Sequence, residues 1–410
     1  METNDLIQHL LDFLHKDRMV DATRISNLSA EGWQSLLALA ATQRVRPLLW
    51  HRLRQKGLDE TVPHNVAVEL RKVFLRNTMC NLRRYGELRC LLSALKAEGI
   101  TLILLKGMVL ADAVYDNMGL REMTDIDVLA HPSDISRISE ILEGLGYTSP
   151  QVSYSDNHLP PMIKSGCSPI EIHWNLIKPS ESYSIDPECL WGHAVTSQIA
   201  SCTVLTLSHE ELLLHLCLHT SYQHQFAFGL RPSCDIAETI ARFGSSLDWQ
   251  AITERAVSRG WQRGVYLALR LARDLAGADV PVDVLQRLRP TDMTEAVLGI
   301  AHAQIFNNNG NAIAMPVSLA ALLDSSRLRD KIRILWQRVF LSRDKIAEQY
   351  SVAPDSIRIY GYYLCRLGGL LRRHGRTLEK YQQNDAPLRA RVERTNRISN
   401  WLAGPVVLRK

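Results

Sequence analysis

The 410-residue sequence contains no apolar run long enough to cross a lipid bilayer, which requires about 20 consecutive apolar residues. Its first residues are polar and acidic and lack the basic-then-apolar layout of a secretory signal peptide. The eight cysteines are scattered and form no CxxC pair, so neither a disulfide framework nor a thiolate zinc site is indicated. These absences predict a cytoplasmic protein with reduced thiols and no membrane association.

Motifs of several common enzyme classes are also absent. The sequence has no Walker A motif, no GxGxxG fingerprint and no GxSxG nucleophile elbow. A P-loop NTPase, a dinucleotide-binding dehydrogenase and a serine hydrolase therefore lose support. There is also no fixed-period repeat of the kind that builds solenoids, and no low-complexity segment.

Positive charge is concentrated towards the end of the sequence, although the formal net charge of the whole chain is only +5. Residues 366–410 contain eleven lysine and arginine residues against three acidic ones. Such a basic tail can bind a polyanion, but it is more often a solvated helix face, and aromatic residues are not interleaved as in a base-stacking surface. Nucleic acid is therefore not the expected partner.

The hydrophobic pattern predicts helices in residues 1–98. Apolar residues recur there at spacings of three and four, which is the pattern of one buried helix face. The predicted helices cover residues 4–14, 31–57 and 66–98.

Residues 99–190 have a different pattern, in which short β-branched apolar runs alternate with helical segments. This mixture is typical of a small sheet with helices packed on it. Strands are predicted at residues 100–105, 125–130 and 169–176, and helices at residues 108–115 and 134–144.

From Trp191 onward the pattern predicts helices to the end of the chain, as a helical acceptor-side domain over 191–290 and a C-terminal region over 291–410. Ser208 with a glutamate three residues later fits a capping box at a helix start. Residues 307–312 form a turn-rich loop. The predicted fold class is α+β, a small mixed sheet flanked by mainly helical regions.

Two aspartates, Asp125 and Asp127, lie at the start of the second predicted strand. Side chains two residues apart on a strand share a face, so the two carboxylates are expected to project together. Close carboxylates repel each other unless a cation lies between them. Their oxygen atoms suit Mg²⁺, with Mn²⁺ as the alternative. Alone, a DxD pair is weak evidence, because it can also be a loop-edge acid pair that caps a helix or binds Arg121.

The surroundings of this pair strengthen the metal interpretation. Lys106 and Gly107 lie between a predicted strand and a helix, where free backbone N–H groups and the lysine would bind a phosphate chain. Glu171 and His173 share a face of the third strand, so Glu171 supplies a third carboxylate. Three carboxylates around two magnesium ions are typical of in-line attack on phosphorus.

In this order of strand, helix-opening glycine, DxD pair and third acid, the sequence resembles the polymerase-β-like nucleotidyltransferase superfamily. More closely, it is similar to the bacterial family of uncharacterised nucleotidyltransferases. The resemblance covers most of the chain through "RVRPLLWHRL", "LLKGMVLADAVY", "REMTDIDVL", "EIHWNL", "SHEELLLHLCLH", "CDIAETIAR" and "DWQAITERAVSRGWQRGVYLALRLARDLAG".

The resemblance implies a polymerase-β-like core in which Gly107 is the phosphate-loop glycine and Asp125 and Asp127 are metal ligands. The superfamily commonly has Gly-Ser at the loop, where this family has Lys-Gly. The third acid is usually aspartate and is Glu171 here. The implied activity is transfer of a nucleoside monophosphate from an NTP to a hydroxyl, phosphate or amine of a small molecule, peptide or protein. Two alternatives stay open: phosphoryl or glycosyl transfer from a nucleotide donor, and a degenerate protein that binds a nucleotide or partner.

Further polar residues are candidates for nucleotide or acceptor contacts. Arg121 is expected to neutralise phosphate or to orient a carboxylate. Asp235 forms either an ordinary helical ion pair with Arg231, four residues earlier, or a contact with nucleotide or acceptor. His173 and His219 are candidates for the acceptor side or for supporting the metal ligands. His215, His219 and His224 also have a spacing compatible with zinc, but they form no HExxH motif.

Overall fold

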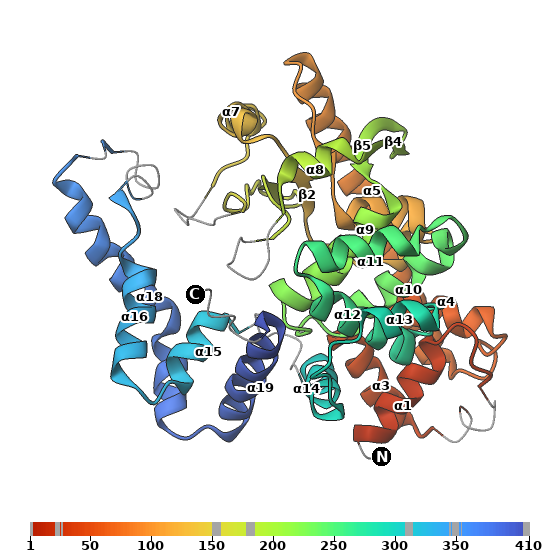
Figure 1. Cartoon of the computed structure of the whole chain (residues 1–410). Coiled ribbons are helices and arrows are strands. Elements are labelled where there is room, and N and C mark those ends of the chain that lie inside the picture. Colours follow the sequence, from red (N-terminus) through yellow and green to blue (C-terminus); the bar gives the residue numbers. More distant parts are fainter. Residues whose placement is uncertain are drawn as a thin grey trace.

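The computed structural model describes residues 3–20, 25, 28–149, 157–177, 185–307, 315–343, 346, 352–353 and 355–404. The protein is mostly helical and has one five-stranded mixed sheet, so the predicted α+β class is confirmed. In Figure 1 the C-terminal helices α15, α16 and α18 lie together on one side of the molecule, and α19 runs between them and α14. None of the described helices is both long and apolar enough to span a membrane.

The N-terminal region is helical as predicted, with one correction. It contains α1 (Thr3–Leu14), α3 (Ala30–Thr42), α4 (Arg46–Gln55) and α5 (His64–Ala97). The single helix predicted over 31–57 is wrong, because the chain breaks between α3 and α4. Arg44 adopts a left-handed φ of 57° at this break, and Pro47 occupies the first turn of α4, where a missing N–H costs no helical hydrogen bond.

The sheet contains β1 (Ile103–Leu104), β2 (Ile126–Leu129), β3 (Ile170–His173), β4 (Ala194–Ile199) and β5 (Cys202–Leu207) in the order β3-β2-β1-β5-β4. The β2–β3 and β1–β5 pairs are parallel, and the β1–β2 and β4–β5 pairs are antiparallel. The three strands predicted from sequence are present but shorter than expected.

The expectation of helix from Trp191 onward is wrong over residues 194–207, which form the β4–β5 hairpin. Its two turn residues, Ala200 and Ser201, both have positive φ, as a tight two-residue hairpin turn requires. The β-branched residues of both strands, among them Val195, Thr203 and Val204, favour this structure. Pairing of β5 with β1 therefore extends the predicted sheet by two strands.

The helix after β1 begins at Lys106, two residues before the predicted start. It consists of α6 (Lys106–Val109), continued by a π-helical segment (Leu110–Val114). The next predicted helix is present as a 3-10 turn (Pro132–Asp134) and α7 (Ile135–Gly144).

The remaining described helices follow in chain order. They are α8 (Pro187–Gly192), α9 (His209–Leu218) with a π-helical extension (His219–Gln223), α10 (Arg231–Phe243), α11 (Trp249–Ser258), α12 (Gln262–Ala276), α13 (Val282–Leu288), α14 (Glu295–Phe306), α15 (Val317–Asp324), α16 (Leu328–Val339), α18 (Arg358–Gln382) and α19 (Ala386–Ala403). Beyond Asn307, the predicted loop over 307–312 lies outside the described residues.

The predicted capping box is only half present. Ser208 Oγ accepts the N–H of Glu211 at 3.4 Å and so caps α9. The Glu211 carboxylate, however, is fully buried and binds Arg255 and Arg259 on α11 and the following turn. The glutamate therefore fastens α11 to α9 instead of closing the cap.

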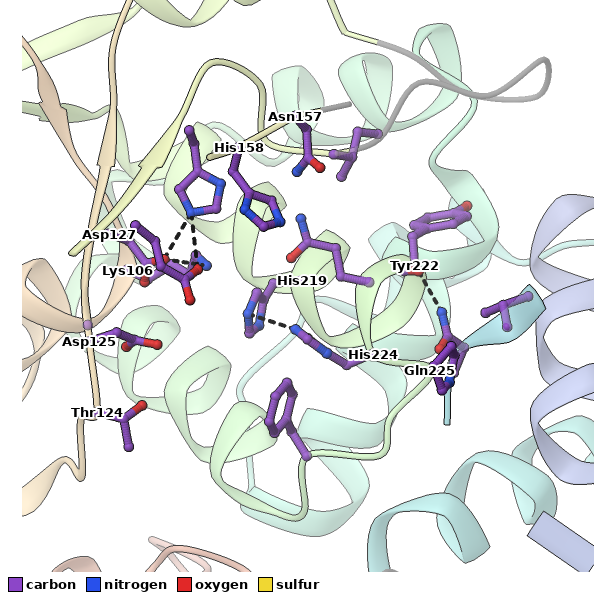
Figure 2. Close-up of a pocket in the computed structure, with 18 of the residues that line it drawn as sticks. Lys106, Thr124, Asp125, Asp127, Asn157, His158, His219, Tyr222, His224 and Gln225 are labelled. Atoms are coloured by element: carbon purple, nitrogen blue, oxygen red, sulfur yellow. Dashed lines mark hydrogen bonds and ion pairs between the residues drawn. The ribbon is translucent and has the colours of Figure 1, made fainter. Parts of the chain in front are cut away.

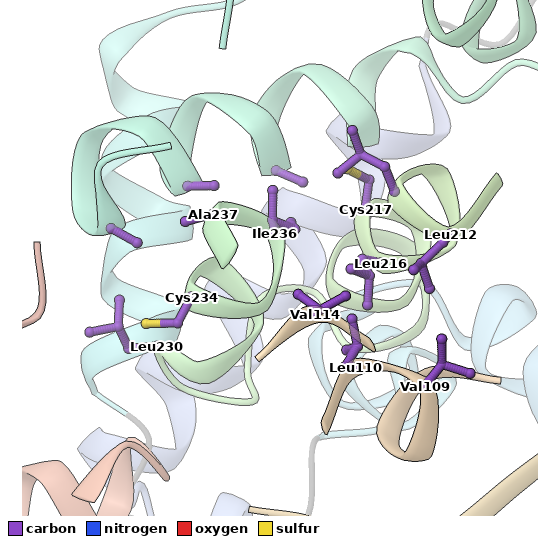
Figure 3. Packing of buried hydrophobic residues seen from close by; sticks show 14 of the residues in the cluster. Val109, Leu110, Val114, Leu212, Leu216, Cys217, Leu230, Cys234, Ile236 and Ala237 are labelled. Atoms are coloured by element: carbon purple, nitrogen blue, oxygen red, sulfur yellow. The ribbon is translucent and has the colours of Figure 1, made fainter. Parts of the chain in front are cut away.

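One hydrophobic core joins the N-terminal helices, the sheet and the helices up to α14. Figure 3 shows part of it: Val109, Leu110 and Val114 of the segment after β1 pack among buried residues of α9 and α10. This packing holds the start of α6 in a constant position relative to α9 and α10. Met315, Leu319, Ala320, Leu323 and Val392 form a separate small core between α15 and α19.

Candidate functional site

A pocket of about 770 Å³ lies where the sheet, the α9–α10 segment and the C-terminal helices meet. The sheet side contributes Lys106, Asp125, Asp127 and Glu171, as part of Figure 2 shows. The segment after α9 contributes His219, Tyr222, Gln223, His224, Gln225, Phe228 and Arg231, and the C-terminal helices contribute Val317, Arg338, Ser399, Asn400, Leu402 and Ala403. A volume of this size is in the range of small-molecule sites.

At the sheet end of the pocket, Asp127, Glu171 and His173 come together because β2 and β3 are parallel and Asp127 is in register with Glu171. Asp127 Oδ1 lies 3.0 Å from His173 Nε2, which is 3.7 Å from Glu171 Oε2. One ligand atom of each residue lies within 4.8 Å of the others, and among the residues that the structure describes this is the group able to hold a metal ion.

Lys106 also reaches this group. Its Nζ lies 3.2 Å from Asp127 Oδ1, and both side chains are buried, with exposed fractions of 10% and 6%. A buried carboxylate needs a partner of opposite charge. Lys106 therefore supplies the positive charge beside Asp127 when no metal is bound.

Asp125 lies just before the strand whose first residue it was predicted to be. It precedes β2, is half-buried, and faces the pocket on the same side as Asp127. The predicted group was Asp125, Asp127 and Glu171, whereas His173 takes the third place in the compact group. The i, i+2 spacing correctly placed both aspartates on the pocket, but the position of His173 depends on the pairing of β2 with β3.

The charges of these groups are strongly perturbed. Burial and the neighbouring carboxylates of Asp127 and Asp125 raise the pKa of Glu171 to about 7. Burial alone would raise the pKa of Asp127, but the Lys106 ammonium and the hydrogen bond from His173 outweigh it and hold this pKa below its usual range. Burial lowers the pKa of His173. Asp127 is thus the ionised acid of the group, and Glu171 changes charge near neutral pH.

His173 is oriented through a single ring nitrogen. Its Nε2 lies against Asp127, and its buried Nδ1 has no hydrogen-bond partner in the part of the chain that the structure describes. A neutral imidazole whose proton is on Nε2 donates to the Asp127 carboxylate, and this is the assignment that satisfies the contact. In that state His173 orients a carboxylate.

The turn between β1 and α6 contains an unusual residue. Lys106, not Gly107, has positive φ, at 33°, which is uncommon for a residue with a side chain. A Cβ at Gly107 would lie 3.2 Å from both Arg121 Nη1 and Met123 Sδ. A side chain at this position would therefore have to displace the ends of the Arg121 and Met123 side chains.

Replacing Gly107 by valine is expected to weaken NTP binding at least tenfold, or about 1.4 kcal/mol. The added side chain would enter the pocket and push against Arg121, which cannot move freely. Calorimetric titration of Mg·NTP measures the effect, and circular dichroism checks the fold. Gly144→Val is the matched control, because a Cβ at Gly144 would meet no atom within 4 Å. An unchanged affinity in Gly107→Val would contradict the expectation that this turn binds the phosphates of a nucleotide.

Arg121 and Asp235 form a buried bidentate pair. Arg121 Nε and Nη2 donate to the two oxygens of Asp235, both at 2.9 Å, and the Tyr115 hydroxyl donates to Oδ1 at 2.9 Å. The predicted helical pair between Arg231 and Asp235 is wrong, because Arg231 Nη1 donates instead to the Glu122 carbonyl at 2.8 Å. Arg121 lines the pocket, but the carboxylate that it orients is Asp235 on α10.

The three histidines after β5 do not form a group of metal ligands with another histidine, cysteine or acid among the described residues. His219 and His224 line the pocket with their Nε2 atoms 3.2 Å apart, and His215 is buried behind them. His158 also lines the pocket, with its ring centroid 5.2 Å from that of His173. His219, a candidate for the acceptor side, is among the residues that line the pocket.

Several pocket residues had no clear signal in the sequence. Arg44 and Phe228 come from short loops, and Val317, Ser399 and Asn400 come from helices far along the chain. Arg44 and Arg46, just before Pro47 at the start of α4, form a basic pair that is visible in the sequence. The others become neighbours only through the tertiary fold.

Comparison with known proteins gives one match. The model of a family described as uncharacterised nucleotidyltransferase matches residues 29–277, which include the sheet, the Lys106 turn and α10. No curated protein and no solved structure matches the chain.

Proposed function

Because the chain belongs to the uncharacterised nucleotidyltransferase family, we propose that it transfers a nucleoside monophosphate from an NTP to a hydroxyl, phosphate or amine of an acceptor. The acceptor would be a small molecule, a peptide or a protein. We include in this proposal a polymerase-β-like core within residues 99–190, extended by the β4–β5 hairpin. The helices over 191–290 would then form the acceptor side, followed by the C-terminal region over 291–410. The observation that supports it best is the buried Asp127–Glu171–His173 group at the end of the pocket.

The residues present fit a divalent cation. Asp127 and Glu171 offer oxygen atoms from adjacent strands, Asp125 offers another at the same wall, and Lys106 marks a place where positive charge is needed. An all-oxygen site suits Mg²⁺, whereas nitrogen ligation by His173 would shift the preference towards a transition metal such as Mn²⁺. A cation held there would neutralise phosphate charge and favour ionisation of an acceptor hydroxyl.

The protein's own groups then have distinct roles. Asp127 and Glu171 would hold the cation, and His173 would keep the Asp127 carboxylate oriented through its Nε2–H. With Asp127 neutralised by the cation, the Lys106 ammonium would be free to turn towards the phosphates above the Gly107 turn. Tyr222, His224 and the C-terminal wall would surround the acceptor.

The direct test is incubation of the full chain with each NTP, Mg²⁺ or Mn²⁺ and a panel of acceptors. Mass spectrometry should detect an acceptor heavier by one nucleoside monophosphate, together with release of pyrophosphate. A product heavier by a phosphoryl or glycosyl group would contradict the proposed reaction. Equal Mg·NTP binding by the parent and by site variants, without any product, would indicate a degenerate nucleotide-binding protein.

Asp125→Asn is expected to lower turnover at least tenfold while leaving the melting temperature unchanged. Asp125 is half-buried, and no ion pair to it occurs among the described residues, so its loss leaves no buried charge unpaired. Product formation and thermal melting measured on the same preparation check this. Full activity in Asp125→Asn would exclude this aspartate from the site.

A further inference from the structure

Two arginines on the pocket wall, Arg44 and Arg231, come from loops that are fastened together. Arg44 lies between α3 and α4, and Arg231 begins α10. The N–H of Arg231 donates to the Gln43 carbonyl at 3.3 Å. Gly229, with φ of 77°, packs so closely that a Cβ there would lie 3.1 Å from the Gln43 Cα. The backbone of each loop therefore fixes the position of the other.

The Arg44 side chain is held by an aromatic ring. Its guanidinium lies 5.5 Å from the centroid of the Phe228 ring, and both residues line the pocket. Phe228 also contacts His224, with ring centroids 3.9 Å apart. The backbone of Arg44 is left-handed, with a φ of 57°, which is uncommon for a residue with a side chain. In this conformation the Arg44 side chain lies at the pocket.

Arg231 has unused hydrogen-bonding capacity. Its Nη1 donates to the Glu122 carbonyl, but its Nε is buried and has no hydrogen-bond partner among the described residues. The nearest carboxylate along α10, that of Asp235, is already bound by both Nε and Nη2 of Arg121. Burial and the neighbouring Arg121 lower the pKa of Arg231 to about 10, so it stays charged at neutral pH.

The local charge is therefore unbalanced. Among the residues that the structure describes, no carboxylate lies within ion-pair distance of Arg44 or Arg231. The nearby acids are Glu122, whose pKa is raised by burial despite the surrounding arginines, and Asp125 and Asp235, whose charges act on Arg231. Two guanidinium groups on the wall of a pocket, neither in an ion pair with a described carboxylate, favour a ligand with several negative charges.

We infer that Arg44 and Arg231 form a phosphate-binding subsite, separate from the Lys106 turn and attached to the same pocket. This inference rests on the proposed function for its context and adds a second contact for phosphate. Guanidinium groups bind phosphate oxygens in a bidentate manner, and both of these arginines line the pocket. The phosphate belongs either to the β,γ end of the NTP or to a phosphorylated acceptor.

The test uses inorganic tripolyphosphate as the probe, titrated into the full chain by calorimetry. Arg44→Asn removes the guanidinium and keeps a residue that tolerates positive φ. It is expected to lower tripolyphosphate affinity at least tenfold, as is Arg231→Gln, with the fold of both checked by circular dichroism. Arg71→Gln, an exposed arginine on α5, is the matched control and should bind as the parent does. Equal affinity in the parent and in folded Arg44→Asn and Arg231→Gln, or an equal loss in Arg71→Gln, would overturn the inference.

Two further titrations identify the source of the phosphate. If it is the NTP tail, Arg44→Asn weakens Mg·NTP binding about as much as tripolyphosphate binding and leaves nucleoside monophosphate binding unchanged. If it is an acceptor phosphate, Mg·NTP binding is unchanged, and binding of inorganic phosphate to NTP-saturated protein is lost. If the protein binds tripolyphosphate through Arg44 but forms no product, the proposed function is refuted and the phosphate-binding subsite still stands.

Discussion

Asp127→Asn is expected to reduce transfer by about 100-fold or more and also to lower the free energy of unfolding of the metal-free protein by about 3 kcal/mol. The catalytic loss follows from removal of the central carboxylate of the Asp127–Glu171–His173 group. The stability loss follows because Lys106, with 10% of its side chain exposed, loses its counter-ion. The sequence alone suggests that removing one of the two close carboxylates, Asp125 or Asp127, should not destabilise the protein. The contact of Asp127 with Lys106 reverses that expectation for Asp127.

A double variant separates the two effects. Lys106→Met together with Asp127→Asn removes both buried charges, so stability should return towards that of the parent while transfer stays lost. Chemical denaturation and a product assay on the two single variants and the double variant form a complete cycle. A parental unfolding free energy in Asp127→Asn would show that the contact with Lys106 does not stabilise the fold.

Glu171→Gln is expected to lower turnover by a similar factor of about 100, since ligands that act as one unit give non-additive losses. It should also remove a pH dependence that the parent has. A metal ion binds the carboxylate, and the pKa of Glu171 is about 7 in the metal-free protein. Below pH 7 the parent should therefore lose about tenfold in metal affinity per pH unit, and above pH 7 its affinity should level off.

The raised pKa of Glu171 also determines how the free energy of unfolding changes with pH. The folded pKa of Glu171 is raised above its ordinary value of 4.5, so the protonated acid is favoured in the fold. This contribution to stability is complete below about pH 4.5 and is lost as the pH rises to about 7.

Metal titrations at several pH values test the expected pH dependence of metal affinity. The affinity of the parent should fall with pH below pH 7, and the affinity of Glu171→Gln should not change with pH. Glu171→Asp is the control, because it keeps a carboxylate on a side chain shorter by one methylene, and it should retain turnover. A pH-independent metal affinity in the parent would contradict the assignment.

Local patterns in the sequence were sufficient for much of the fold. Apolar spacing located α1 and α5 within a few residues, and short β-branched runs located β1 to β3. The same reasoning missed the β4–β5 hairpin, whose turn is Ala-Ser and contains none of the glycine or asparagine that usually signals a hairpin. It also missed the break at Arg44, because the apolar spacing continues across it.

For the candidate site, the sequence indicated which residue types matter but not how they pair. Asp127, Glu171 and Lys106 do meet, because strand spacing and the parallel β2–β3 pairing place them at one edge. The partner of Asp235 could not be predicted, since Arg231 and Arg121 are both plausible from sequence and only the packing of α10 against the π-helical segment after α6 brings Arg121 to it. The roles proposed for these residues remain predictions for the experiments above.

The pocket is lined both by residues inside the family match and by residues beyond it. The family match ends at residue 277, yet Val317, Arg338, Ser399 and Asn400 line the pocket from beyond it. The helices that carry them have a small core of their own and are attached to the main core through Ile398 and Leu402 of α19. If the proposed function holds, substitutions in that wall should alter acceptor choice without disturbing the carboxylates. Exchanging α15–α19 between family members would then test whether this wall sets specificity, with Ile398 and Leu402 as the positions to preserve.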